Sequence, residues 1–162
     1  MTLLKEEKRL KRLQDIGILD TPESRDFRDC AAQALGLFPG ASIAAISLVD
    51  QNRQWFKTII GLNVKETPRS LSFCSHTIET EDGVMVVEDA TRDSRFSTNT
   101  LVTSSPGVRF YAGVKLMDGV GALCVIGTSP RQADASELVK LKKLANYVDI
   151  QLLAHGTLFN LP

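Results

Sequence analysis

The chain has 162 residues, of which 43% are hydrophobic and 23% are charged, a composition typical of a globular protein with one core. Lysine plus arginine equals aspartate plus glutamate at 19 each, so no excess positive charge exists to neutralise phosphates, which argues against a nucleic-acid partner. No apolar run approaches the roughly 20 residues of a membrane-spanning helix, so we expect no membrane partner and a cytoplasmic location.

The cysteine content points to free thiols. The chain has three cysteines, Cys30, Cys74 and Cys124, an odd number at wide spacing. This pattern argues against a disulfide framework and fits a reducing compartment.

Two helices are predicted at the N-terminal end. Residues 3–14 carry leucines spaced for one face of a helix, with charged residues over the rest. This stripe consists of Leu3, Leu10 and Leu13. A second helix follows, with Thr21 as its cap and Pro22 at its first position, and runs to about Leu35.

Five strands are predicted in the middle of the chain. The β-branched runs at 42–49 and 54–60 are separated by turn formers and predict a hairpin. A single strand is expected at 84–89. The runs at 108–116 and 121–127 flank an Asp-Gly pair, which is a strong hairpin signal.

The remaining segments complete an α+β pattern. A short helix is expected at 72–78, and the polar stretch 90–107 predicts a long loop with a turn or two of helix. Residues 134–156 predict a long amphipathic helix whose buried stripe is Leu138, Leu141, Ala145, Val148 and Leu152. Hairpins and terminal helices together predict an antiparallel β-sheet with helices packed on one face.

Seven segments resemble, in order, those of GAF domains at the N-termini of bacterial signalling proteins. They are LDTPES at 19–24, NRQWFK at 52–57, GLNVKETPR at 61–69, SFCSHTI at 72–78, DSRFSTNTLV at 93–102, VRFYAGVKL at 108–116 and LCVIG at 123–127. The resemblance implies a GAF/PAS-like fold with a ligand pocket on the sheet face opposite the helices. The pocket would be roofed by the short helix and the long loop.

Ten residues are candidates for this pocket. Strand alternation sends one aromatic residue of each neighbouring pair to the pocket side. The guanidinium groups of Arg69, Arg95 and Arg109 could pair with an anionic ligand, or with Asp89 and Asp93 in salt bridges that pin the loop. The candidates are Trp55, Phe56, Arg69, Phe73, Cys74, His76, Asp89, Phe96, Arg109 and Tyr111.

Cys74 has two interpretations. If Ser72 caps the short helix, the helix dipole would lower the pKa of the Cys74 thiol. The spacing of Leu71, Cys74 and Ile78 instead places the thiol on an apolar stripe, which favours simple packing. His76 falls on a different face, so we expect no Cys-His couple and no metal site.

The resemblance also includes enzymes. Free methionine sulfoxide reductases use a cysteine similar in position to Cys74, but residues 101–109 lack the family's second cysteine. Cys30 lies on a helix stripe and Cys124 inside a strand, so neither is an obvious resolving thiol. The motifs of bilin-binding photoreceptors are absent.

We therefore expect a sensory or regulatory GAF domain that is not an enzyme. Residues 1–18 would form a dimerisation helix, 19–156 the GAF domain and 157–162 a tail. The domain would bind a small ligand of unidentified chemistry, or form a homodimer through its terminal helices, and signal to a histidine kinase or diguanylate cyclase. The alternatives are a thiol redox enzyme that uses Cys74, and a ligand-free dimerisation scaffold.

Overall fold

The computed structural model describes residues 1–162 and contains one six-stranded sheet in the order β3-β2-β1-β6-β5-β4. All neighbouring strands are antiparallel, which confirms the predicted α+β class. The strands are β1 (Ile43–Val49), β2 (Arg53–Ile60), β3 (Glu66–Pro68), β4 (Val84–Val87), β5 (Phe110–Lys115) and β6 (Gly121–Gly127). The short edge strand β3 lies between the first hairpin and the short helix, where no strand was predicted.

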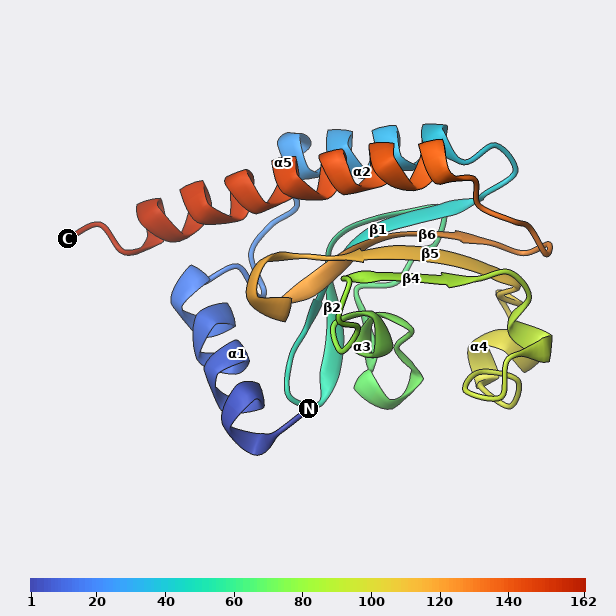
Figure 1. The fold of residues 1–162 in the computed structure, drawn as a ribbon. Helices are drawn as coiled ribbons and strands as arrows, with labels where there is room; N and C mark the ends of the chain where they lie inside the picture. Colours follow the sequence, from blue (N-terminus) through green and yellow to red (C-terminus); the bar gives the residue numbers. More distant parts are fainter.

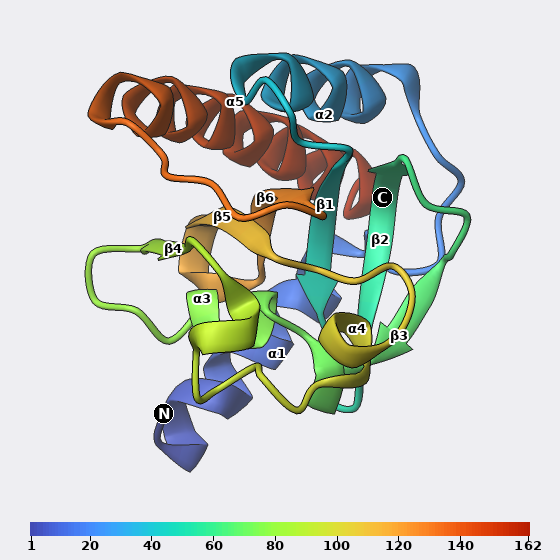
Figure 2. The same cartoon turned by 90° about the vertical axis from the view of Figure 1, so that its right-hand side faces the viewer.

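Helices cover both faces of this sheet (Figures 1 and 2). The long helices α2 and α5 pack on one face, and the short helix α3 packs on the other, against β1, β4, β5 and β6. The helices are α1 (Leu3–Ile16), α2 (Arg25–Leu37), α3 (Cys74–Thr77), α4 (Thr100–Thr103) and α5 (Ala135–Phe159). Single 3₁₀ turns occur at η1 (Arg69–Leu71), η2 (Ala90–Arg92) and η3 (Met117–Gly119).

Strand β1 is buried along its whole length because both sheet faces are covered. Ala44, Ile46 and Leu48 belong to the core beneath α2 and α5. Ala45 and Val49 belong to a second core beneath α3. A strand between two apolar layers needs apolar residues on both sides, which explains its continuous hydrophobic run.

A β-bulge in β2 decides which side chains reach each core. Ile46 pairs with Thr58 while Ser47 pairs with Phe56, so Lys57 is the extra residue. Trp55 belongs to the core beneath the long helices, whereas Phe56 packs against the core beneath α3. Of this aromatic pair, only Phe56 faces the expected pocket.

The start of α2 differs from the prediction. The helix begins at Arg25 with Ser24 at the cap position, three residues later than expected. The Thr21 hydroxyl is already used, because it donates to the carbonyl oxygen of Ile18 and accepts from the Lys57 ammonium at 2.9 Å. Thr21 is thus bound to Ile18 and Lys57 and lies outside the helix, which begins four residues later.

The leucine stripe predicted for α1 is correct at Leu13, which is buried, and wrong at Leu3. Leu3 is 83% exposed, whereas the residues that α1 buries are Arg9, Leu13 and Ile16. Contacts from a buried arginine set the orientation of this helix, as described below.

Helix α5 matches its prediction closely. Leu141, Ala145, Val148 and Leu152 are buried, and an Asp134 capping box begins the helix. None of the helices combines the length and the apolar character that crossing a bilayer requires.

Candidate functional site

The roof of the site is built from η1 and α3, and Ser72 holds it in two ways. Its hydroxyl oxygen accepts a hydrogen bond from the backbone N–H of Ser75, in the first turn of α3, at 3.1 Å. The same hydroxyl donates to the side-chain oxygen of Gln54 on β2 at 2.8 Å. The start of the roof is therefore attached directly to the sheet.

A buried tyrosine holds the other side of the roof. The Tyr111 hydroxyl on β5 lies 2.8 Å from the Thr77 hydroxyl and 3.2 Å from the Cys74 sulfur. Leaving such a buried hydroxyl without partners would cost about 1–3 kcal/mol. A Cβ atom at Gly113 would lie 2.2 Å from the Tyr111 hydroxyl oxygen, so glycine at that position leaves space for the ring.

Aromatic contacts join the roof to the long loop. The rings of Phe73 and Phe96 stack at 4.0 Å with an interplanar angle of 8°, and Phe73 also lies 5.4 Å from the ring of Tyr111. His76 meets Phe96 edge-on at 4.9 Å. Because these rings form one packed unit, the loop and α3 are expected to move together.

A small cavity lies between the roof and the sheet. Its volume is about 50 Å³, and twelve of its fifteen lining residues are hydrophobic. The lining residues are Ile43, Ala45, Gln54, Phe56, Ile59, Leu62, Thr67, Phe73, Cys74, Leu101, Pro106, Val108, Tyr111, Cys124 and Ile126. This is room for one or two waters, whereas pockets for drug-sized ligands measure roughly 300–1,000 Å³.

Two thiols meet at this cavity. Cys74 comes from α3 and Cys124 from β6, and both side chains line this one cavity. The expectation that Cys124 is no obvious partner for Cys74 is therefore wrong. Both side chains are buried, so the packing interpretation of Cys74 also describes its surroundings correctly.

The two thiols have unequal acidity. Hydrogen bonding by Cys124, and further by Tyr111 and Ser47, lowers the pKa of Cys74 despite the opposing effect of burial. The hydrogen bond with Cys74 and burial raise the pKa of Cys124 well above its ordinary value. Cys74 is therefore the thiol of this pair that ionises first.

Of the other candidate residues, Trp55 lies on the opposite sheet face, and Asp89 and Arg109 lie at the two ends of the long loop rather than in the cavity. Asp89 caps η2 by accepting from the backbone N–H of Thr91. Arg109 donates to the carbonyl oxygens of Val102 and Val108 at 2.9 and 3.0 Å. These contacts fix the long loop from within.

A charged pair next to the roof affects His76. Arg95 pairs with Asp93 at 2.7 Å, which is one of the salt bridges expected to pin the loop. Burial and the nearby Arg95 lower the pKa of His76. No group of three or more His, Cys, Asp or Glu residues forms a cluster that could hold a metal ion.

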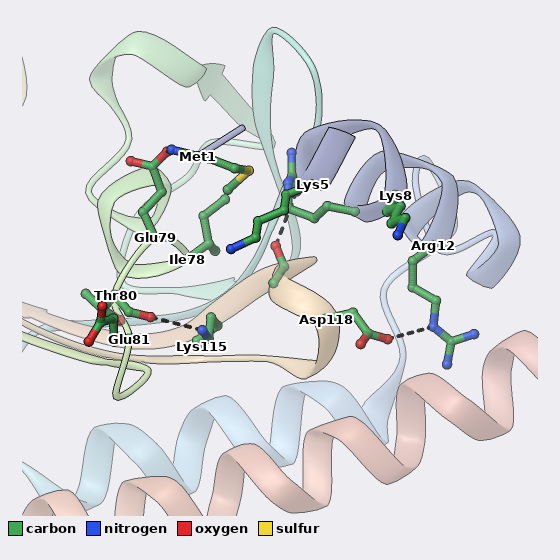
Figure 3. A pocket seen from close by; sticks show the side chains of 12 residues that line it. Met1, Lys5, Lys8, Arg12, Ile78, Glu79, Thr80, Glu81, Lys115 and Asp118 are labelled. Atoms are coloured by element: carbon green, nitrogen blue, oxygen red, sulfur yellow. Dashed lines mark hydrogen bonds and ion pairs between the residues drawn. The ribbon is translucent and has the colours of Figure 1, made fainter. Parts of the chain in front are cut away.

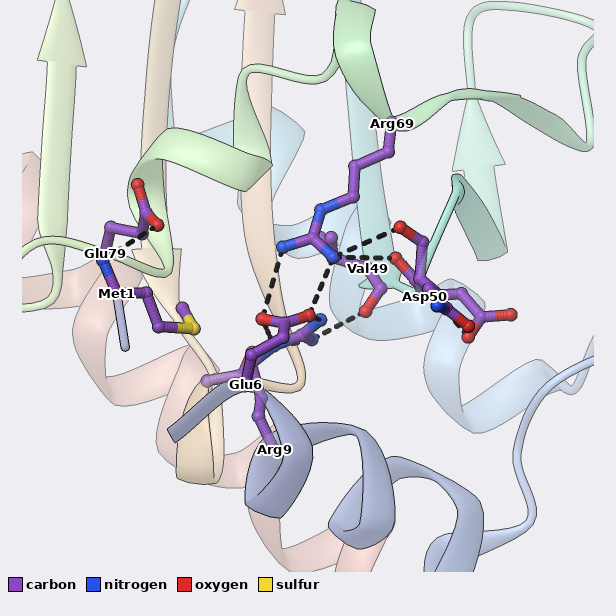
Figure 4. A network of polar contacts seen from close by, with 9 residues as sticks. Met1, Glu6, Arg9, Val49, Asp50, Arg69 and Glu79 are labelled. Carbon is purple, nitrogen blue, oxygen red and sulfur yellow. Dashed lines mark hydrogen bonds and ion pairs between the residues drawn. The ribbon is translucent and has the colours of Figure 1, made fainter. Parts of the chain in front are cut away.

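Arg69 connects the roof to α1 (Figure 4). Its guanidinium lies 2.7 Å from the Glu6 carboxylate, which also binds Arg9 at 2.6 Å. Arg9 is 4% exposed and donates to the carbonyl oxygen of Val49 at 2.6 Å. Arg9 and Arg69 lower the pKa of Glu6 to about 2. This network explains why α1 buries an arginine beside Leu13 and Ile16.

A larger groove lies between α1 and η3 (Figure 3). Its volume is about 750 Å³, but ten of its twelve lining residues are not hydrophobic. Arg12 pairs with Asp118 at 3.0 Å, and Lys115 donates to the carbonyl oxygen of Thr80. We take the cavity beneath α3 as the candidate site, because it contains the chain's only grouping of thiols.

One curated protein sequence is clearly similar to the chain. A cyclic di-GMP phosphodiesterase of Pseudomonas aeruginosa is 40% identical over 130 residues, which cover 78% of this chain. The match spans only 22% of that protein. No family model matches the chain.

Solved structures establish the fold. The GAF domain of an Acinetobacter phosphoenolpyruvate-protein phosphotransferase matches with a TM-score of 0.66 at 16% identity, covering 99% of this chain and all of that one. The free methionine-R-sulfoxide reductase of Neisseria meningitidis matches with a TM-score of 0.61 at 21% identity, covering 94% and 90%. The chain has the GAF fold, as the sequence motifs predicted.

The expectation that the chain is not an enzyme is contradicted by these comparisons. Free methionine-R-sulfoxide reductases are among the proteins that share its fold, and the similar Pseudomonas protein is named as a phosphodiesterase. Proteins with this fold serve both signalling and catalysis.

The Glu6 network generates a stability prediction. Glu6→Gln removes the negative charge that compensates the buried Arg9, so we expect the free energy of unfolding at pH 7 to fall by about 1–3 kcal/mol. The measurement is urea denaturation, with Glu7→Gln on the exposed face of the same helix as the matched control. The control should change by less than about 0.5 kcal/mol.

Wild type and Glu6→Gln are also compared as the pH is lowered, to measure how the free energy of unfolding depends on pH. The folded pKa of Glu6 lies below its ordinary value of 4.5, so its contribution is complete above 4.5 and is lost as the pH falls toward 2. The difference between wild type and Glu6→Gln should therefore shrink in that window. A difference that is already absent at pH 7 would show that the network does not hold α1.

Proposed function

We propose that the chain, which has the GAF fold, is a regulatory domain that controls the turnover of cyclic di-GMP through the site beneath α3. The 40% identity to a cyclic di-GMP phosphodiesterase supports the choice of effector. The observation that carries the proposal is a small cavity whose roof is a four-residue helix connected to α1. A roof this short can be displaced without unfolding the sheet.

The size of the cavity restricts how a signal could act there. A volume of about 50 Å³ accepts a molecule of a few atoms without rearrangement. A larger ligand has to displace α3, Phe73 and the loop carrying Phe96. Binding is then coupled to the roof position, because such a ligand has different free energies in the closed and open states.

We propose that the signal passes from the roof of the site to α1 through Arg69. Residues Arg69–Leu71 immediately precede Ser72 and α3, and the Arg69 guanidinium binds Glu6 of α1. Movement of the roof would therefore strain or break the attachment of α1. In this proposal residues 1–18 form the segment that relays the signal, and residues 19–156 form the sensing domain.

A homodimer through the terminal helices is part of the proposal. Tyr147, Ile150 and Leu153 on α5 are 51%, 61% and 48% exposed. Leu158, Phe159 and Leu161 extend this apolar surface to the C-terminal end. A second copy of the chain packed against α5 would remove these side chains from water.

The dimer is tested by sedimentation velocity. Ile150→Glu places a charge in the proposed interface, so we expect it to convert dimers into monomers at micromolar concentration. Arg92→Glu, on an exposed side chain of η2 at the opposite sheet face, is the control and should remain dimeric. A wild-type chain that sediments as a monomer would contradict the proposal.

The regulatory role is tested by grafting this chain in place of the matching segment of the Pseudomonas phosphodiesterase. Ala45 lines the cavity, so Ala45→Leu fills it and should displace the roof. We expect the rate of cyclic di-GMP hydrolysis by the graft to change at least about twofold, because a change of about 0.4 kcal/mol in the activation free energy is enough for that.

The control for the graft is Ala32→Leu, which makes the same change at an exposed position of α2. Melting temperatures of both variants establish that the domain stays folded. A graft whose hydrolysis rate is the same with Ala45→Leu and Ala32→Leu would refute control through the cavity.

A second candidate function is a thiol reductase that uses Cys74. The proximity of Cys74 and Cys124 at one cavity favours it, as does the shared fold with free methionine-R-sulfoxide reductases. The cavity is too small for a sulfoxide amino acid in the closed state, so catalysis would require α3 to open.

A further inference from the structure

The three cysteines differ in what surrounds them. Cys30 lies on α2 with its thiol 3.9 Å from the Gln151 side-chain oxygen and no other thiol nearby. Burial and the neighbouring acidic residues Asp26 and Asp29 raise its pKa. Cys74 and Cys124 instead line the same cavity beneath α3.

We propose that Cys74 and Cys124 form a reversible dithiol–disulfide site that is oxidised by small hydroperoxides. Both thiols line the same cavity, and both lie next to the Tyr111 hydroxyl: it is 3.2 Å from the Cys74 sulfur, and it faces Gly113, the strand partner of Cys124. They come from different layers of the fold, since Cys74 belongs to the roof and Cys124 to the central sheet. A bond between them would therefore join the roof covalently to the sheet.

The surroundings favour Cys74 as the attacking thiol. The thiolate is the nucleophile, and the hydroxyl of Tyr111 lies 3.2 Å from the Cys74 sulfur, where it can stabilise negative charge. The Thr77 hydroxyl, 2.8 Å from that of Tyr111, orients the tyrosine. Cys124 makes no such contact with a hydroxyl group, so it acts second.

The reaction proceeds in two balanced steps. The Cys74 thiolate attacks the terminal oxygen of the hydroperoxide, the O–O bond breaks, and the alkoxide or hydroxide takes up the proton that Cys74 lost. Cys124 then attacks the sulfur of the Cys74 sulfenic acid, forming the S–S bond and releasing water. Two thiols are oxidised to one disulfide, and one hydroperoxide is reduced to an alcohol or water.

The cavity selects the class of oxidant. Hydrogen peroxide has two heavy atoms and fits a volume of about 50 Å³ that borders both sulfurs. The lining is mostly apolar, which suits a small neutral molecule better than a charged one. The closed roof excludes larger oxidants from the thiols.

Disulfide formation has a structural consequence for α3. Both cysteines are free thiols, and a disulfide brings the two sulfurs to about 2.05 Å, which draws Cys74 and the four-residue helix that carries it toward β6. This shift would replace the contact between Cys74 and the Tyr111 hydroxyl. The oxidised and reduced forms therefore differ in the position of the roof.

The experiment treats the full chain with hydrogen peroxide, blocks remaining thiols with N-ethylmaleimide and maps the peptides by mass spectrometry. The expected product is an intramolecular Cys74–Cys124 disulfide with a loss of two hydrogens, reversed by dithiothreitol. Cys30→Ser should give the same product. Cys124→Ser should stop at a Cys74 sulfenic acid that dimedone traps, and Cys74→Ser should give no disulfide.

The peptide map of the peroxide-treated wild-type chain tests the proposed disulfide even where a variant fails to fold. A folded, peroxide-treated wild-type chain with no Cys74–Cys124 disulfide, or with Cys30 in the disulfide instead, would overturn the proposal. The inference is independent of the effector and of the second candidate function. Incubation with methionine-R-sulfoxide and dithiothreitol tests that function separately, through the release of methionine, whereas the peroxide map tests the disulfide.

Discussion

The buried hydroxyl of Tyr111 is the interaction on which the site depends. It is fully enclosed, so it must find partners inside the protein, and it finds them at Thr77 and Cys74 within a single turn of helix. A four-residue helix has little stability of its own. The tyrosine therefore supplies the attachment that holds α3 in place and brings Cys74 over Cys124.

The rest of the fold follows from covering both faces of one sheet. Apolar helices cover one face, and the second core is closed by α3, the stacked rings of Phe73 and Phe96, and the long loop. Because the second cover consists of short segments, it depends more on individual polar contacts. The same holds for α1, where the Glu6 carboxylate binds both Arg9 and Arg69, in addition to the packing of Leu13 and Ile16.

The sequence predicted the parts of the structure that depend on local pattern. The apolar stripe of α5, the hairpins and the short helix that begins after Ser72 follow from spacing and turn chemistry. Of the ten candidate residues, Phe56, Phe73, Cys74 and Tyr111 line the cavity. Cys124 was missed because the face on which a strand residue lies depends on register and sheet order.

The cap of α2 and the buried face of α1 were also predicted incorrectly, because both depend on long-range contacts. Lys57 is the extra residue of a bulge, and it occupies the Thr21 hydroxyl that would otherwise have capped α2. Arg9 is buried because Glu6 and the carbonyl oxygens of Val49 and Gly119 satisfy its charge and hydrogens. No local pattern within α1 or α2 reveals these partners.

Hydrogen exchange of Tyr111→Phe, which removes only the hydroxyl, tests the central claim most directly. The amide of Ile78 donates to the Cys74 carbonyl oxygen and reports on α3. If the variant lowers the free energy of opening α3 by about 1–1.4 kcal/mol, this amide should exchange about five- to tenfold faster. Exchange in α5 should be unchanged. Tyr147→Phe, at an exposed position, should have no effect. Unchanged exchange in α3 of Tyr111→Phe would contradict the account, because the roof would then be held by something else.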